Sequence, residues 1–254
     1  MNSVIVDIKN LRREFKMGDE IVKALNDVSF TINSGEFVTI MGSSGSGKTT
    51  LLNILGCLDR PTAGDYVLDG INMNSLSKNE LARLRNQKLG FIFQSYNLLA
   101  RTSAIENVEL PLLYNPEISA KVRREKALSA LESVALSDRI HYLPNQLSGG
   151  QQQRVAIARA LVNDPVMILA DEATGNLDSR TSYGIMALMQ ELNEVRGKTI
   201  VFITHEPDIA AFSKRTITLR DGKIINDNVN RNIRSAKELL QSLPSLVDLI
   251  PEKK

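Results

Sequence analysis

The sequence predicts one α/β domain built on a mainly parallel sheet, with a helical lobe inserted between its early and late strands. The apolar, strand-like run Phe37–Met41 ends at a glycine-rich loop, and the helix-like run Thr49–Gly56 follows. Further along, strand patterns at Val166–Ala170 and Thr199–Thr204 enclose a helical pattern at Ser179–Val195. A strand, a helix and a strand in succession are typical of a parallel sheet, and 254 residues are enough for one large domain.

The N-terminal third of the chain has the pattern of strands. Apolar and polar residues alternate at Val4–Ile8 and at Val28–Ile32, as in strands with one buried face. A third strand pattern, Tyr66–Leu68, is followed by Asp69 and Gly70, a pair that favours a tight hairpin turn.

The helical lobe is expected from about Leu98 to Asp164. Within it, Ser119–Ala135 is rich in helix-forming residues and begins with a serine that can serve as N-cap. Gln151–Val162 is a second helix, rich in alanine. Past Asp227 the pattern weakens, and Ser235–Leu243 is predicted to form a short amphipathic helix.

Composition argues against several classes of protein. The chain has 31 Lys and Arg against 29 Asp and Glu, a net charge of +2, which gives no electrostatic reason to expect a nucleic-acid partner. The single cysteine, Cys57, excludes an internal disulfide framework and suggests a reducing compartment. No apolar run approaches the roughly 18 residues of a membrane-spanning helix, and the first residues do not resemble a signal peptide. We therefore expect a cytoplasmic chain whose role at a membrane comes through a partner.

The strongest chemical signal is Gly42–Thr49, which matches the phosphate-loop pattern of glycine, any four residues, Gly-Lys and Ser or Thr. It lies between a predicted strand and a predicted helix, as the pattern requires. Glycines let the backbone curl so that N–H groups converge on phosphate oxygens, and the helix directs its positive end there. Lys48 can place its charge against the β- and γ-phosphates, and the Thr49 hydroxyl can ligate Mg²⁺. The loop predicts a nucleoside triphosphate site of the P-loop NTPase kind.

Two carboxylates follow the predicted strand Val166–Ala170 and fit the second half of such a site. Asp171 would hold Mg²⁺ through water, and Glu172 would polarise the attacking water. A third motif, Leu147–Gln151, lies directly before the alanine-rich helix, and Ser148 with two glycines at a helix start forms a second anion-binding terminus.

The run Leu147–Gln151 resembles the signature sequence of the ATP-binding-cassette (ABC) ATPases. Other motifs of that family follow in its order: Phe15 matches the aromatic residue that stacks on adenine, Gln94 the Q-loop glutamine, Asn176–Asp178 the D-loop and His205 the switch histidine. The resemblance covers about Val4 to Asp227, nearly 90% of the chain. Within the family the chain is most similar to the bacterial branch of MacB, LolD and FtsE. Four runs carry that similarity: Arg13–Glu20, Asn53–Asp59, Gly90–Gln94 and Leu147–Ala160.

This resemblance implies the ABC ATPase fold, in which a P-loop NTPase core with a mixed, mainly parallel sheet carries an N-terminal antiparallel β lobe and a helical subdomain, here about residues 98–164. It divides the chain into an ATPase domain at 1–227 and a helical tail at 228–254. It assigns catalysis to Glu172, His205 and Gln94, and Mg²⁺ to Thr49, Gln94 and Asp171. It assigns ATP to Phe15, Gly42, Ser43, Ser44, Gly45, Ser46, Gly47, Lys48, Thr49, Thr50, Ser148, Gly149, Gly150, Gln151 and Asp178.

The resemblance also implies an assembly. Two chains are expected to pair head to tail, with each ATP between the phosphate loop of one chain and the signature of the other. A separate membrane permease of the FtsX or MacB kind is expected at the Q-loop and helical lobe, on the inner face of the cell membrane, with room for a periplasmic or surface adaptor. Such a subunit would hydrolyse ATP to drive export of drugs, peptides or lipoproteins.

Two alternatives stay open. A soluble ABC ATPase of DNA repair or translation shares the motifs, although such proteins usually carry coiled-coil insertions or two cassettes. A P-loop kinase or GTPase gives no reason for the run at Leu147–Gln151.

The chain departs from the family at three places. Phe15 stands where tyrosine is common, which keeps the ring and loses its hydroxyl. Ala173 replaces the usual proline after Glu172, so the glutamate is expected to be less rigidly aimed. The segment from Asn228 to Lys254 has no family motif.

Overall fold

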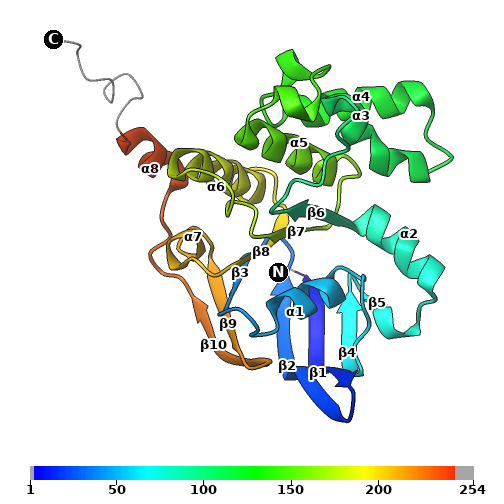
Figure 1. Cartoon of the computed structure of the whole chain (residues 1–254), viewed down its shortest axis with the longest axis vertical. Helices are drawn as coiled ribbons and strands as arrows, with labels where there is room; N and C mark the ends of the chain where they lie inside the picture. The colour runs from blue at the N-terminus through cyan, green and yellow to red at the C-terminus, as the bar shows by residue number, and fades with distance from the viewer. Residues whose placement is uncertain (1–2, 244–254) are drawn as a thin grey trace.

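Two sheets organise residues 3–243, the part of the chain that the computed structural model describes (Figure 1). The larger sheet has the strand order β10-β9-β3-β8-β7-β6. Strands β9, β3, β8, β7 and β6 run parallel to their neighbours, and β10 pairs antiparallel with β9. The carboxyl ends of β3, β6, β7 and β8 therefore meet at one edge, where the predicted motifs follow. The bounds are β3 Phe37–Met41, β6 Leu89–Phe93, β7 Met167–Asp171, β8 Thr199–Thr204, β9 Arg215–Arg220 and β10 Lys223–Val229.

The smaller sheet is antiparallel and has the order β2-β1-β4-β5. Helix α1 (Lys48–Leu55) packs between the two sheets, because Leu51 and Leu55 share a buried cluster with residues of β1, β3 and β8. This packing fixes the β1–β2 hairpin beside the phosphate loop. The strands are β1 Val4–Met17, β2 Glu20–Asn33, β4 Ala63–Leu68 and β5 Ile71–Asn72.

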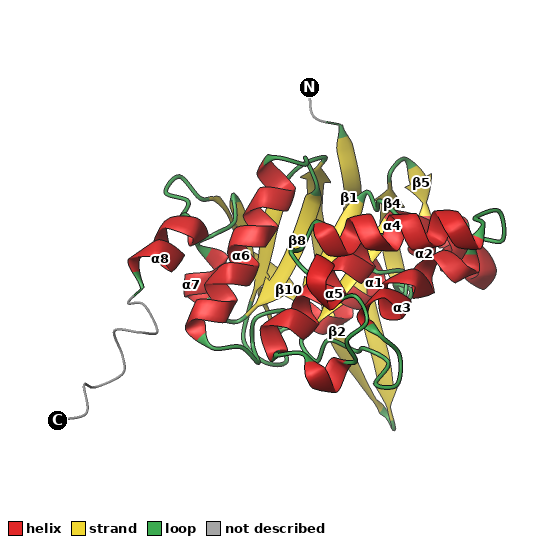
Figure 2. Cartoon of the chain, turned by 90° about the horizontal axis from the view of Figure 1, so that it is seen from above, coloured by secondary structure: helices red, strands yellow, loops and turns green. Residues whose placement is uncertain are grey.

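A helical lobe of α3, α4 and α5 lies beyond β6, at the top of Figure 1, and α6, α7 and α8 lie beside it (Figure 2). Both groups of helices share one buried cluster with the same face of the larger sheet, and α1 packs on the opposite face. The helices are α2 Lys78–Lys88, α3 Ala104–Glu109, α4 Ala120–Glu132, α5 Gly149–Leu161, α6 Ser179–Glu194, α7 Pro207–Ala210 and α8 Ala236–Ser242. Short 3₁₀ turns occur at Met73–Ser75, Leu110–Tyr114, Ser137–Arg139 and Pro144–Gln146. None of the helices within residues 3–243 has the length and apolarity that a bilayer span needs.

Side-chain caps fix where most of these helices begin. At six helix starts a Ser or Asp oxygen accepts the backbone N–H three residues later, which satisfies one of the donors that a helix start leaves free. These caps are Ser77, Ser103, Ser119, Ser148, Asp178 and Ser235. The cap predicted at the start of the Ser119 helix is confirmed.

The fold confirms the predicted α/β class. The bounds of some strands and helices, however, differ from those that the local sequence pattern predicts. The predicted strands Phe37–Met41 and Thr199–Thr204 are observed with the same bounds. The first two strands are longer than predicted, 14 residues each, because their outer halves are held by pairing with each other and expose many side chains. Helices α2 and α3 and strands β9 and β10 had not been predicted.

The last strand of the larger sheet, β10, ends at Val229, two residues after the domain boundary expected at 227. The predicted helix after Ser235 is present as α8 and contacts α6. The Gln190 side chain of α6 joins them, donating to the carbonyl of Arg234 at 2.8 Å and accepting the N–H of Ala236 at 2.9 Å. The rest of the expected tail, residues 244–254, lies outside the described residues.

Candidate active site

The phosphate loop curls around the side chain of Lys48, the first residue of α1. Its Nζ donates to the carbonyls of Gly42 at 2.7 Å and Ser43 at 2.8 Å. Gly47 has φ +104°, and a Cβ there would lie 2.5 Å from the carbonyl oxygen of Ala24 in β2. Only glycine fits at this point, so the hairpin and the loop are locked together.

The loop presents what a phosphate and a hard cation require. Thr49 is exposed beside the buried Lys48, and the buried Oγ of Ser46 has no hydrogen-bond partner among the described residues. Residues 3–243 contain no cluster of three His, Cys, Asp or Glu side chains that could enclose a metal. The exposed Thr49 hydroxyl is a hard oxygen donor of the kind that suits Mg²⁺, which takes one or two protein oxygens and completes its shell with water and phosphate.

The predicted acidic pair lies at the end of β7. Burial raises the pKa of Asp171, the charge of Glu172 raises it further, and the Lys48 ammonium lowers it. The adjacent pair Asp171 and Glu172 thus shares one electrostatic environment with Lys48, which is far away in the sequence. Glu172 has φ +43°, a left-handed conformation that is costly for a side chain with Cβ, and its N–H is bonded to the carbonyl of Ile203 in β8. The strained turn directs both carboxylates to the same edge of the sheet.

His205, directly after β8, reaches the same point. Its Nδ1 lies 2.8 Å from Oε1 of Glu172. This histidine is predicted to contact the γ-phosphate. The structure adds a partner that the order of the motifs does not specify, namely the carboxylate that is predicted to polarise water.

Gln94 follows β6 and bridges to the D-loop. Its Nε2 lies 3.4 Å from Oδ1 of Asn176, and the Asn176 amide donates to the Gln94 carbonyl at 3.2 Å. Gln94 also lies against Gly175, where a Cβ would come within 2.8 Å of its Nε2. The Q-loop and the D-loop of one chain are therefore in direct contact.

The signature motif forms the start of α5. Ser148 caps the helix and Gln151 caps it reciprocally, accepting the Ser148 N–H at 2.9 Å. Gly150 touches the start of α6, because a Cβ on it would lie 2.4 Å from Cγ2 of Thr181. Asp178 caps α6 by accepting from the Thr181 N–H and hydroxyl, and these bonds lower its pKa.

The structure does not bring this motif to the phosphate loop of its own chain. The start of α5 belongs to the helical lobe, whereas α1 lies beneath the larger sheet (Figure 1). Lys48, Asp171, Glu172 and His205 are gathered at one edge of the sheet, whereas in the signature motif Gly149 lies against Tyr96 and Gly150 against Thr181.

Gln153 is a residue of the site region that the sequence analysis missed. It is fully buried in α5, and its Nε2 donates to the carbonyl of Ala173 at 2.7 Å and lies 3.5 Å from that of Phe93. Its Oε1 is buried without a partner among the described residues. This side chain links the signature helix to the residues that follow Glu172 and precede Gln94. A glutamine on the otherwise apolar face of the helix is the signal that could have pointed to it.

Phe15 lies on β1 with 39% of its surface exposed. The guanidinium of Arg13 stands over its ring, with Cζ 4.5 Å from the ring centroid. Arg13 was not predicted as part of the site.

Comparisons with known proteins agree with this geometry. The ABC transporter family model matches residues 25–175. The macrolide export ATP-binding/permease protein MacB of Hyphomonas neptunium is 53% identical over 91% of this chain, and the chain spans 36% of that protein's length. MJ0796 of Methanocaldococcus jannaschii, named as an ABC transporter ATP-binding protein, is 52% identical over 87% of this chain and 95% of its own.

A solved structure of MJ0796 is similar to most of this chain. It is a dimeric post-hydrolysis state bound to ADP and Pi, and it matches with a TM-score of 0.82 and 49% identity over 89% of this chain and 99% of that one. The chain therefore belongs to the ABC transporter family and is an ATP-binding, ATP-hydrolysing protein of its MacB and MJ0796 type.

Proposed function

We propose that two copies of this chain pair head to tail around two ATP molecules and drive a membrane permease. The observation that carries the pairing is the divided site. One chain gathers Lys48, Asp171, Glu172 and His205 at one sheet edge, while its capped signature helix begins at Gly149 in another lobe and presents the backbone N–H groups of its first turn there. A second copy would supply that helix start to the γ-phosphate. The dimeric state of MJ0796 supports this arrangement.

In the proposed site each side chain has a chemical task. Lys48 exchanges its bonds to the loop carbonyls for the β- and γ-phosphates, and the loop N–H groups bind the same oxygens. Thr49, Asp171 and Gln94 would hold Mg²⁺, which would neutralise charge at the phosphates. Phe15 offers its ring to adenine.

Hydrolysis is then an in-line displacement. A water oxygen forms a bond to the γ-phosphorus as the bond from that phosphorus to the β–γ bridging oxygen breaks, giving ADP and phosphate. Glu172 accepts the water proton, and His205 orients Glu172 through the 2.8 Å contact while facing the γ-phosphate. Loss of the shared γ-phosphate loosens the pair.

The proposed permease contact is a groove between the helical lobe and the sheet, with a volume of about 990 Å³. It is lined by β6, the end of α2 and the turn before Asn115, and exposed Tyr114 lies at its margin. We assign it to a cytoplasmic helix of the permease, because the MacB relative joins its ATP-binding part to a permease in one chain and this chain matches 36% of it. Phe93, adjacent to Gln94, lines the groove, so nucleotide state can be sensed there.

This arrangement places the chain at the cytoplasmic face of a membrane and makes export the favoured direction, as in the macrolide export relative. In a MacB-like assembly the permease would in turn engage a periplasmic or surface adaptor. The relatives are named as transporter proteins, so a soluble ATPase of repair or translation is not favoured.

The test of the pairing is gel filtration of Glu172→Gln with ATP and Mg²⁺. The variant loses the base and keeps the binding groups, so we expect a dimer with ATP and a monomer with ADP. Lys48→Ala should stay monomeric with either nucleotide, and Lys78→Ala, which changes the first residue of α2 away from the site, should not alter the behaviour of Glu172→Gln. A Glu172→Gln chain that binds ATP and stays monomeric would overturn the pairing.

The permease is tested separately, by affinity capture of the tagged chain from detergent-solubilised native membranes and mass spectrometry. We expect a stoichiometric membrane permease. Recovery of soluble repair or ribosomal proteins alone would overturn the transporter assignment.

A further inference from the structure

Arg13 makes two contacts that the recognised motifs do not explain. Its Nε donates to Oδ2 of Asp59 at 2.8 Å and its Nη2 to Oδ1 at 2.9 Å, a two-bond pairing of planar groups. The same guanidinium has its Cζ 4.5 Å from the centroid of the Phe15 ring. The side chains of Arg13 and Asp59 are only 23% and 29% exposed, so solvent screens this pair less than it would a surface pair.

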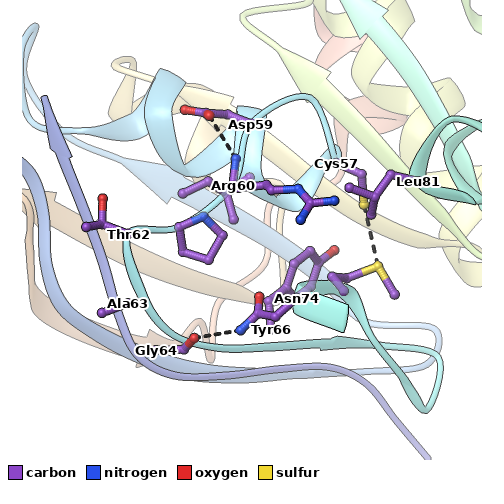
Figure 3. Close-up of a pocket in the computed structure, with 12 residues that line it drawn as sticks. Cys57, Asp59, Arg60, Thr62, Ala63, Gly64, Tyr66, Asn74 and Leu81 are labelled. Atoms are coloured by element: carbon purple, nitrogen blue, oxygen red, sulfur yellow. Dashed lines mark hydrogen bonds between the residues drawn. The ribbon is translucent and has the colours of Figure 1, made fainter. Parts of the chain in front are cut away.

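Asp59 is itself held in place, at the edge of a small pocket (Figure 3). Its Oδ1 also accepts the backbone N–H of Arg60 at 2.8 Å, and its own N–H donates to the carbonyl of Asn53 at 3.1 Å. Asn53 is in α1, the helix whose first residue is Lys48. One rigid helix therefore connects the phosphate loop to the carboxylate that orients Arg13.

Arg13 covers one face of the Phe15 ring, and the ring is still 39% exposed. A cation prefers the electron-rich face of an aromatic ring, so this contact fixes the plane of the ring. Asp59 neutralises the guanidinium, which makes Arg13 a poor candidate for binding a free phosphate and a good one for stacking.

We propose that Arg13 is a positioning residue for the nucleotide base. Held by Asp59, it orients the Phe15 ring so that the opposite face receives adenine, and through α1 it sets the base platform relative to the phosphate loop. This inference rests on the proposed assignment of Phe15 to adenine.

The neighbouring residue provides a matched control. Arg12 donates to Asp27 through Nε at 2.8 Å and Nη2 at 2.9 Å, the same two-bond geometry on the same strand. That pair is about half exposed, and no ring contact accompanies it among the described residues.

The experiment is calorimetric binding of ADP, which is not hydrolysed, and of pyrophosphate, which has no base, to the full chain. We expect Arg13→Gln to weaken ADP binding about two- to five-fold, the value of a modest cation–π contact, and to leave pyrophosphate binding unchanged. Arg12→Gln should leave both unchanged. Phe15→Ala should weaken ADP binding by about five-fold or more.

A charge-swapped variant, Arg13→Asp with Asp59→Arg, distinguishes the role of Arg13 in orienting the Phe15 ring from the contribution of the ion pair to folding stability. It should regain the thermal stability that either single change loses, because the ion pair is restored, but not the ADP affinity, because no guanidinium remains at position 13.

Four outcomes would overturn the inference or the assignment on which it rests. Equal effects of Arg13→Gln and Arg12→Gln, or an equal loss of pyrophosphate binding, would show a merely structural role. Tighter ADP binding by Arg13→Gln would show that arginine competes with adenine for the ring. Unchanged ADP binding by Phe15→Ala would instead remove the adenine assignment on which the inference depends.

Discussion

Nδ1 of His205 and Oε1 of Glu172 lie 2.8 Å apart, at the ends of the neighbouring strands β8 and β7. Parallel pairing of these strands places the two side chains together although 33 residues separate them. The histidine thus has two tasks in the proposed mechanism, holding the base and facing the γ-phosphate.

Replacing His205 by alanine should lower kcat for ATP hydrolysis by about a hundredfold or more, because a group aimed at the charge of the transition state is lost. Binding of ADP should change little. His141, the other histidine of the chain, is exposed in the helical lobe, and His141→Ala is the matched control. A wild-type kcat in His205→Ala, measured by phosphate release, would contradict the role.

The contact between the signature and α6 predicts a second effect. Gly150→Ala places a methyl group 2.4 Å from Cγ2 of Thr181, so the start of α5 must move. In the Glu172→Gln background this change should weaken the ATP-dependent dimer while ADP binding by the monomer is retained.

Thr181→Ser should restore the dimer in that chain, because it removes Cγ2 and leaves the hydroxyl that bonds to Asp178. The nearest remaining Thr181 atoms would then be 3.8 Å from the new Cβ, an ordinary contact. Failure of this second change to rescue dimerisation would show that Gly150 is needed for another reason.

Replacing Gln153 should lower both the free energy of unfolding and kcat for ATP hydrolysis. Gln153→Leu leaves the buried carbonyl of Ala173 without its donor and should lower the free energy of unfolding by about 1–3 kcal/mol. If this bond positions the turn after Glu172, kcat should fall more than KM changes.

Gln152→Leu is the control for Gln153, since the Gln152 side chain bonds locally, to the carbonyl of Leu147 at 3.1 Å, and to no other residue within 3–243. Denaturant unfolding and steady-state kinetics measure both effects. A loss of stability with unchanged kcat would reduce Gln153 to a structural residue.

Cys57 gives a pH-dependent prediction. Burial raises the pKa of its thiol from 9.0 to about 11, although Arg85 lowers it, and its Sγ faces the sulfur of Met73 at 3.6 Å (Figure 3). The folded protein should react slowly with iodoacetamide at pH 8, because the thiolate is the reactive form. The burial of the neutral thiol stabilises the fold below pH 9, and this contribution should be lost as the pH rises towards 11. Alkylation at pH 8 that is as fast in the folded as in the unfolded chain would contradict this.

Local sequence patterns were enough to predict the phosphate loop and the elements on either side of it. The phosphate loop Gly42–Thr49 is one contiguous segment. The apolar pattern predicts the strand before it and the helix after it, and the glycines mark the loop between them. The bounds of β3 and β8 were predicted because these strands are buried on both faces and read as continuous apolar runs. By contrast, β10 exposes most of its side chains and β9 buries only Ile217 and Leu219, and their pairing is what makes them strands.

The sequence by itself determined which groups are present and in what order: the phosphate loop, the carboxylates after an apolar strand, and a capped helix at Ser148. Only the tertiary structure determined which of these groups contact one another. Parallel strand order brought His205 to Glu172, and the packing of α1 brought Asp59 to Arg13 and hence to Phe15. It also kept the start of α5 away from α1. Local patterns fix the conformation of short segments, whereas these contacts depend on how buried faces of distant elements fit, which no short segment contains.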